Sequence, residues 1–106
     1  MTNILIADAH PILRMGLSMV LNSAEEFYLQ DAVASTSQLF SAIEKQIPHI
    51  VILEMDIPEI NGIATIRRLK KINSNIKVLI FSSQPESVYA LSAVRAGAYG
   101  YLPKTA

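Results

Sequence analysis

The chain has 106 residues, of which 51% are hydrophobic, and this is enough for one domain with one buried core. Nine basic and nine acidic side chains cancel, so no net charge attracts nucleic acid or an anionic membrane surface. The absence of cysteine excludes disulfides and thiolate sites, and no apolar run approaches the ~20 residues of a membrane-spanning helix, so we expect a cytoplasmic protein.

The chain opens with an apolar strand and an apolar helix. Residues 4–7 form the strand, which ends at Asp8, and Pro11 suits the first turn of the helix, where its missing N–H has no cost. Residues 12–21 make this helix apolar over most of its circumference, so we expect other elements to cover it well.

A second strand and a second helix follow. Residues 27–34 are more polar than the first strand, which is typical of a strand at the edge of a sheet. Pro48 ends the helix, for which the sequence predicts the buried stripe Leu39, Phe40, Ile43 and Ile47 and a cap at Ser35, Thr36 or Ser37.

The central stretch is a short apolar run that stops at an acid. Residues 50–53 lead into Glu54, and Pro58, Asn61 and Gly62 follow within a few positions. This pattern predicts a buried strand that delivers a carboxylate to the end of a sheet, then a loop that turns into a helix. In open α/β sheets, ligands bind beyond the carboxyl ends of the strands, so Glu54 is the first candidate functional residue.

A third helix begins at Asn61 and Gly62, with an apolar stripe made of Ile63, Ile66, Leu69 and Ile72. Its outer face carries four basic residues near its end: Arg67, Arg68, Lys70 and Lys71. Cations at this end favour the helix dipole, so the cluster is a solvated helix end or, alternatively, a patch that binds phosphate or a partner.

Residues 76–81 form a fourth strand that ends at Ser82. A fourth helix covers residues 85–97, starting at a proline and ending at a glycine. Residues 98–102 are a short fifth strand that leads to Lys104. The sequence predicts that the fourth helix buries Val88, Leu91 and Val94.

Strict alternation of strands and helices predicts an α/β fold with a doubly wound, five-stranded parallel sheet. We expect the flavodoxin-like strand order 2-1-3-4-5, because five strands favour it. In that order strands one, three, four and five lie side by side, so Asp8, Glu54, Ser82 and Lys104 would meet in one crevice.

Two acids, a hydroxyl and a lysine can together support phosphoryl transfer to a carboxylate. The carboxylate needs a divalent cation, and a hydroxyl and an ammonium must hold the phosphoryl oxygens. Each residue alone has a simpler interpretation: Asp8 as a helix cap, Ser82 as a strand-end hydroxyl, Tyr101 as a half-buried aromatic, His10 as a helix-start residue and Asp56 as an exposed loop acid.

The opening residues 6–11 (IADAHP) and the closing residues 96–104 (AGAYGYLPK) resemble response-regulator receiver (CheY-like) domains of the NarL/FixJ (LuxR-type) subfamily. The resemblance covers essentially all of residues 1–106. It implies a signalling domain that is not an enzyme, with a histidine kinase or another regulator, and a second copy of the chain, as partners. Subfamily members usually carry a C-terminal helix-turn-helix domain, which alone would contact DNA. By resemblance, Ser82 is the switch hydroxyl, Tyr101 the switch aromatic and Lys104 the invariant lysine.

Two departures from the family pattern concern the phosphorylation site. The family's phosphoacceptor aspartate lies four residues before the loop proline, and here that position is Glu54. Asp56 matches the position whose backbone carbonyl contacts the metal. The acidic pair after the first strand is Asp8-Ala9, so the member that ordinarily binds Mg²⁺ directly is missing. The resemblance thus implies a metal set of Asp8, Glu54 and Asp56 that binds Mg²⁺ weakly or not at all.

The longer side chain of Glu54 argues against phosphorylation. It places the carboxylate roughly 1.5 Å farther out than aspartate would, and an error of about 1 Å can cost on the order of 100-fold in rate. Glu54 can instead reach Lys104 without any phosphate. We therefore expect a phosphorylation-independent receiver. The alternative is a working phosphoacceptor that takes a phosphoryl group from a histidine kinase on Glu54 or Asp56. A third hypothesis is an engineered phosphomimic, against which Ala9 argues.

Receivers of this type have a fifth helix after the lysine, packed beside the first helix. The printed sequence stops at Ala106, so we expect the fifth helix to be missing and one apolar face of the sheet to be uncovered. Residues 1–106 would then be an N-terminal fragment of a longer regulator, or a partner chain would cover this face.

Overall fold

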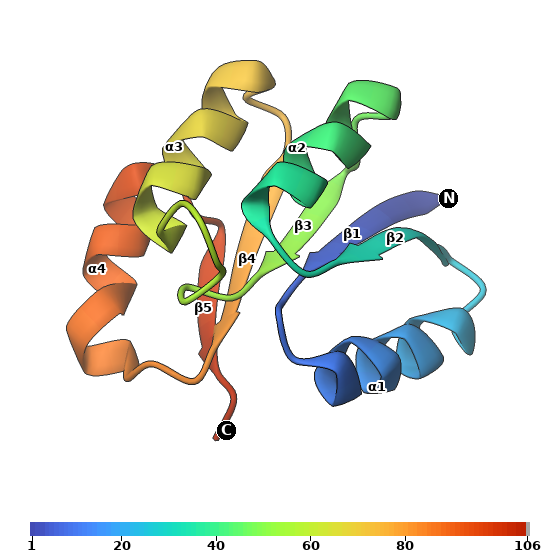
Figure 1. Cartoon of the computed structure of the whole chain (residues 1–106), viewed down its shortest axis with the longest axis horizontal. Helices are drawn as coiled ribbons and strands as arrows, with labels where there is room; N and C mark the ends of the chain where they lie inside the picture. Colours follow the sequence, from blue (N-terminus) through green and yellow to red (C-terminus); the bar gives the residue numbers. More distant parts are fainter. Residues whose placement is uncertain (106) are drawn as a thin grey trace.

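A computed structural model describes residues 1–105 of the chain. Strands and helices alternate throughout, as the sequence predicts (Figure 1). In chain order they are β1 (Thr2–Ala7), α1 (Pro11–Asn22), β2 (Phe27–Val33), α2 (Thr36–Lys45), β3 (Ile50–Leu53), α3 (Gly62–Ile72), β4 (Lys77–Ser82), α4 (Glu86–Ala96) and β5 (Gly100–Pro103).

The five strands form one parallel sheet in the order β2-β1-β3-β4-β5, which confirms the predicted flavodoxin-like topology. Strands β2 and β5 are the two edges of the sheet. Because all strands run in the same direction, their carboxyl ends lie at one side of the molecule. None of the helices among residues 1–105 has the length and apolar composition that a membrane span requires.

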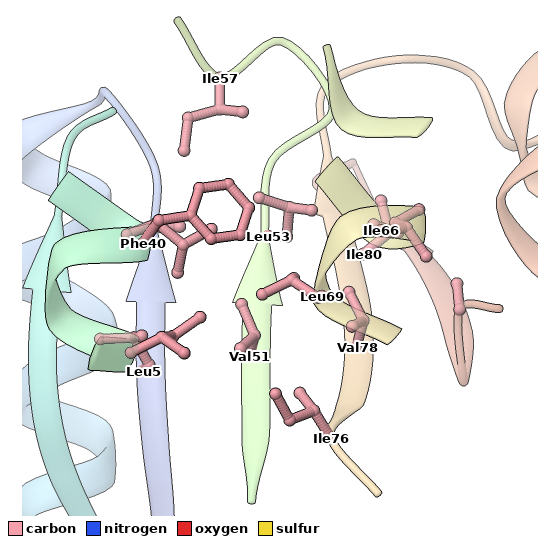
Figure 2. Packing of buried hydrophobic residues seen from close by; sticks show 14 of the residues in the cluster. Leu5, Phe40, Val51, Leu53, Ile57, Ile66, Leu69, Ile76, Val78 and Ile80 are labelled. Carbon is pink, nitrogen blue, oxygen red and sulfur yellow. The ribbon is translucent and has the colours of Figure 1, made fainter. Parts of the chain in front are cut away.

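The main core lies between the sheet and helices α2 and α3 (Figure 2). Alternate residues of the central strands point into it, because successive side chains of a strand face opposite sides. Each fully buried leucine or isoleucine contributes about 1.5–3 kcal/mol. The strands supply Leu5, Val51, Leu53, Val78 and Ile80, and the helices supply Leu39, Phe40, Ile43, Ile66 and Leu69.

Side chains cap α2 and α3 at their first turns. Ser35 is the cap of α2, since its hydroxyl accepts a hydrogen bond from the Gln38 N–H. Asn61 caps α3 by accepting from the Ala64 N–H. Such caps satisfy backbone donors that have no partner within the helix.

The basic residues at the end of α3 are engaged in different ways. The Lys70 ammonium donates to the backbone carbonyls of Ser74 and Ile76, both at 2.7 Å, so it closes the turn that leads into β4. The Arg68 guanidinium lies over the Phe40 ring at 3.9 Å. Two of the four basic side chains, Lys70 and Arg68, therefore contact other parts of the chain.

Three expectations about helix burial are wrong. Helix α1 is poorly covered, because it is the one helix within residues 1–105 on its side of the sheet (Figure 1). Helix α4 approaches its neighbours through the small residues Ala93 and Ala96, so the expected apolar stripe faces outward. The third concerns Ile47 and Ile72, which lie at or beyond helix ends and are exposed. The exposed residues of the other two helices are Ile12, Met15, Met19 and Val20 of α1, and Val88, Leu91 and Val94 of α4.

The expected uncovered apolar face is present in the described part of the chain. Leu79 and Phe81 of β4 point to the α1 side of the sheet and are only half-buried. Leu102, their neighbour on β5, is 45% exposed.

Candidate functional site

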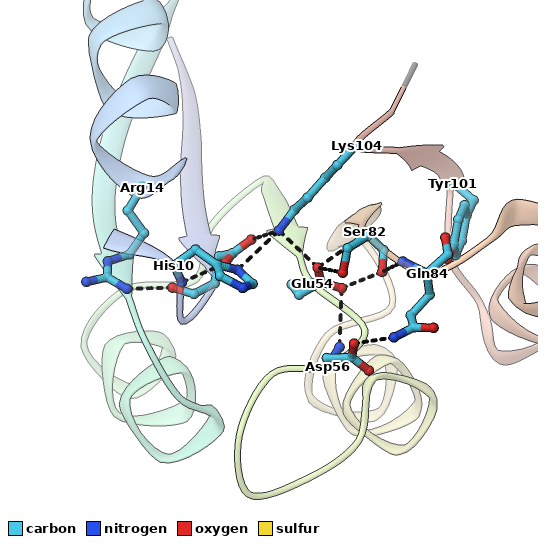
Figure 3. A network of polar contacts seen from close by, with 10 residues as sticks. His10, Arg14, Glu54, Asp56, Ser82, Gln84, Tyr101 and Lys104 are labelled. Carbon is cyan, nitrogen blue, oxygen red and sulfur yellow. Dashed lines mark hydrogen bonds and ion pairs between the residues drawn. The ribbon is translucent and has the colours of Figure 1, made fainter. Parts of the chain in front are cut away.

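The carboxyl ends of four neighbouring strands bring the predicted residues together (Figure 3). Asp8 follows β1, Glu54 follows β3, Ser82 ends β4 and Lys104 follows β5. Backbone hydrogen bonds hold these ends side by side. The Glu54 N–H donates to the Ala7 carbonyl at 3.1 Å, and the Lys104 N–H donates to the Ser82 carbonyl at 2.7 Å.

Glu54 lies at the centre of the site and is only 1% exposed. Its Oε2 accepts from the Ser82 hydroxyl and, at 3.2 Å, from the Asp56 N–H. Its Oε1 accepts from the Ser83 N–H at 3.0 Å and from the Ser83 hydroxyl at 3.2 Å. The Lys104 ammonium pairs with Oε1 at 2.9 Å. Both carboxylate oxygens are therefore fully engaged by donors from three segments of the chain.

These donors favour the charged form of Glu54. Burial alone would raise the pKa of this carboxyl, but the hydrogen bonds from Ser82, Ser83 and Asp56 and the contact with Lys104 lower it to about 2. Burial would likewise lower the pKa of the Lys104 ammonium, while its contacts with Asp8 and Glu54 raise it above its ordinary value. The pair is thus ionised on both sides at neutral pH.

Asp8 forms the second half of the site. Its Oδ2 pairs with the Lys104 ammonium at 2.7 Å. Its Oδ1 contacts Nδ1 of the His10 ring at 2.7 Å and accepts from the His10 N–H at 2.9 Å. The Arg14 guanidinium donates to the Asp8 backbone carbonyl at 2.7 Å, which ties helix α1 to the site. Asp8 therefore binds the lysine and does more than start a helix.

Tyr101 is connected to Glu54 through the loop after β4. Its hydroxyl donates to the Gln84 carbonyl at 2.8 Å, and the Gln84 N–H donates to the Ser82 hydroxyl at 3.1 Å. That hydroxyl in turn donates to Glu54. Burial raises the pKa of Tyr101, which keeps its hydroxyl a donor at neutral pH. The aromatic ring is held in place by this chain of contacts.

Four participants were missed by the sequence interpretation: His10 as a partner of Asp8, and Arg14, Ser83 and Gln84. Asp56 is exposed, as expected, but its carboxylate accepts from the Gln84 side-chain amide. The one available signal was proximity in sequence, because each missed residue lies within seven positions of a strand end.

The residues present do not fit the Mg²⁺ ion that the family resemblance implies. A hard cation of this kind needs several oxygen ligands. Ala9 offers no side-chain donor, and the carboxylates of Asp8 and Glu54 both contact the Lys104 ammonium. The ammonium group lies where the two acids would otherwise share a metal.

Comparisons with known proteins agree with one another. The family model described as "Response regulator receiver domain" matches residues 4–106. The chain is 31% identical over 103 residues to the Fimbriae Z protein of Escherichia coli K12, covering 97% of this chain and 49% of that protein. It is 33% identical over 103 residues to the transcriptional activator protein ExaE of Pseudomonas putida, covering 97% and 48%. The chain thus spans about half the length of these relatives.

Solved structures show the same fold. A LuxR-family two-component response regulator from Aurantimonas sp. SI85-9A1 superposes with a TM-score of 0.91 at 27% identity, covering 99% of this chain and 75% of that one. The isolated receiver domain of RcsB from Salmonella enterica serovar Typhimurium, solved with the phosphomimetic BeF3⁻, superposes with a TM-score of 0.92 at 19% identity, covering 99% and 78%.

Proposed function

The chain belongs to the family of response regulator receiver domains, which are signalling domains, and we propose that it is a receiver whose signalling state does not require phosphorylation. We further propose that it forms the receiver half of a transcriptional regulator. The support for that second step is that one similar protein, ExaE, is named as a transcriptional activator. This relative and the Fimbriae Z protein are both about twice the length of the chain.

The observation that carries the proposal is the ion pair between Glu54 and Lys104, with Nζ and Oε1 2.9 Å apart. The same carboxylate accepts from the Ser82 hydroxyl. By family resemblance, the lysine and the switch hydroxyl are the groups that would hold the oxygens of a phosphoryl group. In this chain the carboxylate of Glu54 takes these donors without any phosphoryl group.

A nucleophilic carboxylate needs an oxygen that can approach phosphorus in line with the leaving group. Both oxygens of Glu54 already accept hydrogen bonds, and the side chain is buried. The site also lacks the carboxylate that Ala9 replaces, so the cation needed to screen an incoming phosphoryl group has few ligands. In-line attack would require breaking several of these contacts first.

The proposed signalling state is therefore set by protein contacts. Glu54 orders Ser82, and the loop that contains Gln84 holds Tyr101. A partner chain or a second copy of the domain would read this arrangement at the surface around Tyr101. In this proposal, a domain outside residues 1–106 would contact DNA. A histidine kinase would bind this receiver without transferring a phosphoryl group to it.

Beryllofluoride with Mg²⁺ tests the proposal, because it adds to a receptive carboxylate as a phosphoryl analogue. In ¹H–¹⁵N spectra we expect the amides of Ser82 and Lys104 in the native chain to stay in place. The double variant Ala9→Asp with Glu54→Asp restores the missing acid and shortens the acceptor, so its amides should shift. The single variant Glu54→Asp is the matched control and should respond more weakly than the double variant. Shifts in the native chain at micromolar analogue would overturn the proposal.

A further inference from the structure

Helices α2 and α3 cover the same face of the sheet and leave a groove between them (Figure 1). The groove consists of two hollows of about 430 and 390 Å³, each lined by residues of both helices. Phe40, Glu44 and Arg68 line both hollows, so the two adjoin. We propose that this α2–α3 groove binds an amphipathic helix of a partner protein that presents an apolar side chain and a carboxylate one turn apart. The inference goes beyond the proposed function and does not depend on Glu54.

The larger hollow has an apolar lining and lies where the two helices end. Phe40 and Ile43 line it and are buried, while Ile47 is 42% exposed and Ile72 is 45% exposed. Single exposed apolar residues are ordinary on a protein surface. Here two of them, one from each side of the groove, line the same hollow. An apolar side chain of a partner that enters this apolar hollow would remove both isoleucines from water.

Arg68 supplies a positive charge where the two hollows adjoin. Its guanidinium lies 3.9 Å from the centroid of the Phe40 ring. An arginine stacked on an aromatic ring still has N–H donors along the edge of its plane, and these match the two oxygens of a carboxylate. Among residues 1–105 no carboxylate forms an ion pair with Arg68, although Glu44 lines the same hollows. The guanidinium is therefore held in position with its charge unpaired.

The helix dipole accounts for the neighbouring cations but not for Arg68. Cations stabilise a helix within its last turn, and in α3 this turn contains Lys70 and Lys71. Arg68 lies four positions before Ile72, the last residue of α3, which is more than one turn away from the end. Of the two interpretations of the basic cluster, a solvated helix end thus suits the lysines, and a partner-binding position suits Arg68.

The charges around the groove set the orientation of the partner. The apolar hollow carries Lys45 and Arg68 against one acid, Glu44. The second hollow, nearer the loop before α3, carries Glu44 and Glu59 against Arg68. The partner's carboxylate therefore belongs beside its apolar side chain, and no further acid belongs over the second hollow. Inorganic phosphate fits less well, because it would pair with Arg68 and leave the exposed isoleucines in water.

The length of the groove suits a short helix. Helices α2 and α3 have 10 and 11 residues, which corresponds to about 15 Å or three turns each. A helix that lies along them would present side chains at positions i, i+3 or i+4, and i+7. An apolar residue at position i in the apolar hollow then places an acid at i+3 or i+4 next to Arg68.

Selection from a displayed library of random peptides of roughly 16 residues, long enough to form a helix, tests the groove. The native chain is the bait, and counter-selection against the double variant Arg68→Ala, Ile72→Ser removes peptides that bind other faces. Both side chains are exposed, so the variant should keep the urea midpoint of the native chain. We expect enriched peptides with an apolar residue and an acid three or four positions apart. No enrichment, or enriched peptides without this acid, would overturn the proposal.

Fluorescence anisotropy of an enriched peptide locates the contact. Arg68→Ala and Ile47→Ser should each weaken binding by about 10-fold. Arg68→Lys keeps the charge but not the planar, stacked fork, so it should also bind more weakly than the native chain. Arg95→Ala is the matched control, because Arg95 is an exposed arginine in the last turn of α4 and lines neither hollow. It should bind the peptide like the native chain.

Equal losses in the Arg68→Ala and Arg95→Ala variants would show a general charge effect and would overturn the groove. Displacement of the peptide by millimolar inorganic phosphate at constant ionic strength would also overturn it, because the cluster would then be an anion site. In ¹H–¹⁵N spectra the peptide should shift the amides of Ile47, Arg68 and Ile72. These outcomes leave the proposed function standing, because the beryllofluoride test reports on Ser82 and Lys104 at the other site.

Discussion

Replacing Glu54 by glutamine keeps the size of the side chain and removes its charge. The native carboxylate accepts from Ser82, Ser83 and Asp56 and pairs with Lys104. Donors face both oxygens of the native carboxylate. An amide has one acceptor oxygen and one NH₂ group, so in Glu54→Gln the NH₂ group must face donors that it cannot accept from. The less costly orientation places the NH₂ at the position of Oε2, where it faces the Asp56 N–H and the Ser82 hydroxyl. The Asp56 N–H then loses its acceptor, the hydroxyl must turn to accept, and Lys104 is left with a neutral oxygen.

Two ways of counting the same contacts give the size of the expected loss. A hydrogen bond to a charged group contributes about 1.5–3 kcal/mol, and the change removes one such bond and weakens the pair with Lys104. The pKa of Glu54 is about 2, against an ordinary 4.5, which corresponds to about 3 kcal/mol in favour of the charged form. We expect Glu54→Gln to lower the free energy of unfolding by about 2–4 kcal/mol at pH 7.

Urea denaturation followed by circular dichroism measures this change as a lower midpoint with an unaltered slope. Glu44→Gln is the control, because Glu44 is an exposed acid on α2 and its replacement should stay within about 0.5 kcal/mol. A Glu54→Gln variant as stable as the native chain, or more stable, would show that the fold does not hold this carboxylate in its charged form.

Three further predictions concern stability. The folded pKa of Glu54 lies below its unfolded value, so its contribution to the free energy of unfolding is fully present above about pH 4.5 and should be lost as the pH falls toward 2. Urea denaturation at several pH values should show a smaller loss of stability over this range in Glu54→Gln than in the native chain. Gly62→Ala should destabilise the fold by about 1–3 kcal/mol in thermal unfolding, because the added Cβ would lie 2.8 Å from the Met55 Cα. Gly16→Ala is the control: its added Cβ meets open space within a helix, so this variant should be more stable than the native chain. Tyr101→Phe removes a hydrogen bond to a backbone carbonyl at 2.8 Å and should cost about 0.5–1.5 kcal/mol by urea denaturation; an unchanged midpoint would count against that bond.

The sheet and the meeting of four site residues follow from the sequence because they depend on order and period alone. Strands that alternate with helices must run parallel, and residues that end parallel strands must gather at one edge. No further information was needed to predict that four residues meet there: Asp8, Glu54, Ser82 and Lys104. The pairing of Glu54 with Lys104 was likewise foreseen, because the longer side chain can reach the ammonium.

Loop contacts and helix exposure could not be foreseen in the same way. The approach of His10 to Asp8 and of Gln84 to Asp56 depends on loop dihedrals that no periodicity encodes. An apolar stripe identifies the face that a helix could bury, but it does not say whether another element lies against it. Helix α4 shows this, because Leu91 is 63% exposed while the small residue Ala93 is buried.

In the proposed function, Glu54 holds the site together without phosphorylation. Intact mass spectrometry of the native chain after incubation with acetyl phosphate and Mg²⁺ tests it directly, with the Ala9→Asp, Glu54→Asp variant as the positive comparison. We predict an unchanged mass for the native chain and an added phosphoryl mass for the variant. An added phosphoryl group on the native chain, located at Glu54 or Asp56 by peptide fragmentation, would contradict the claim.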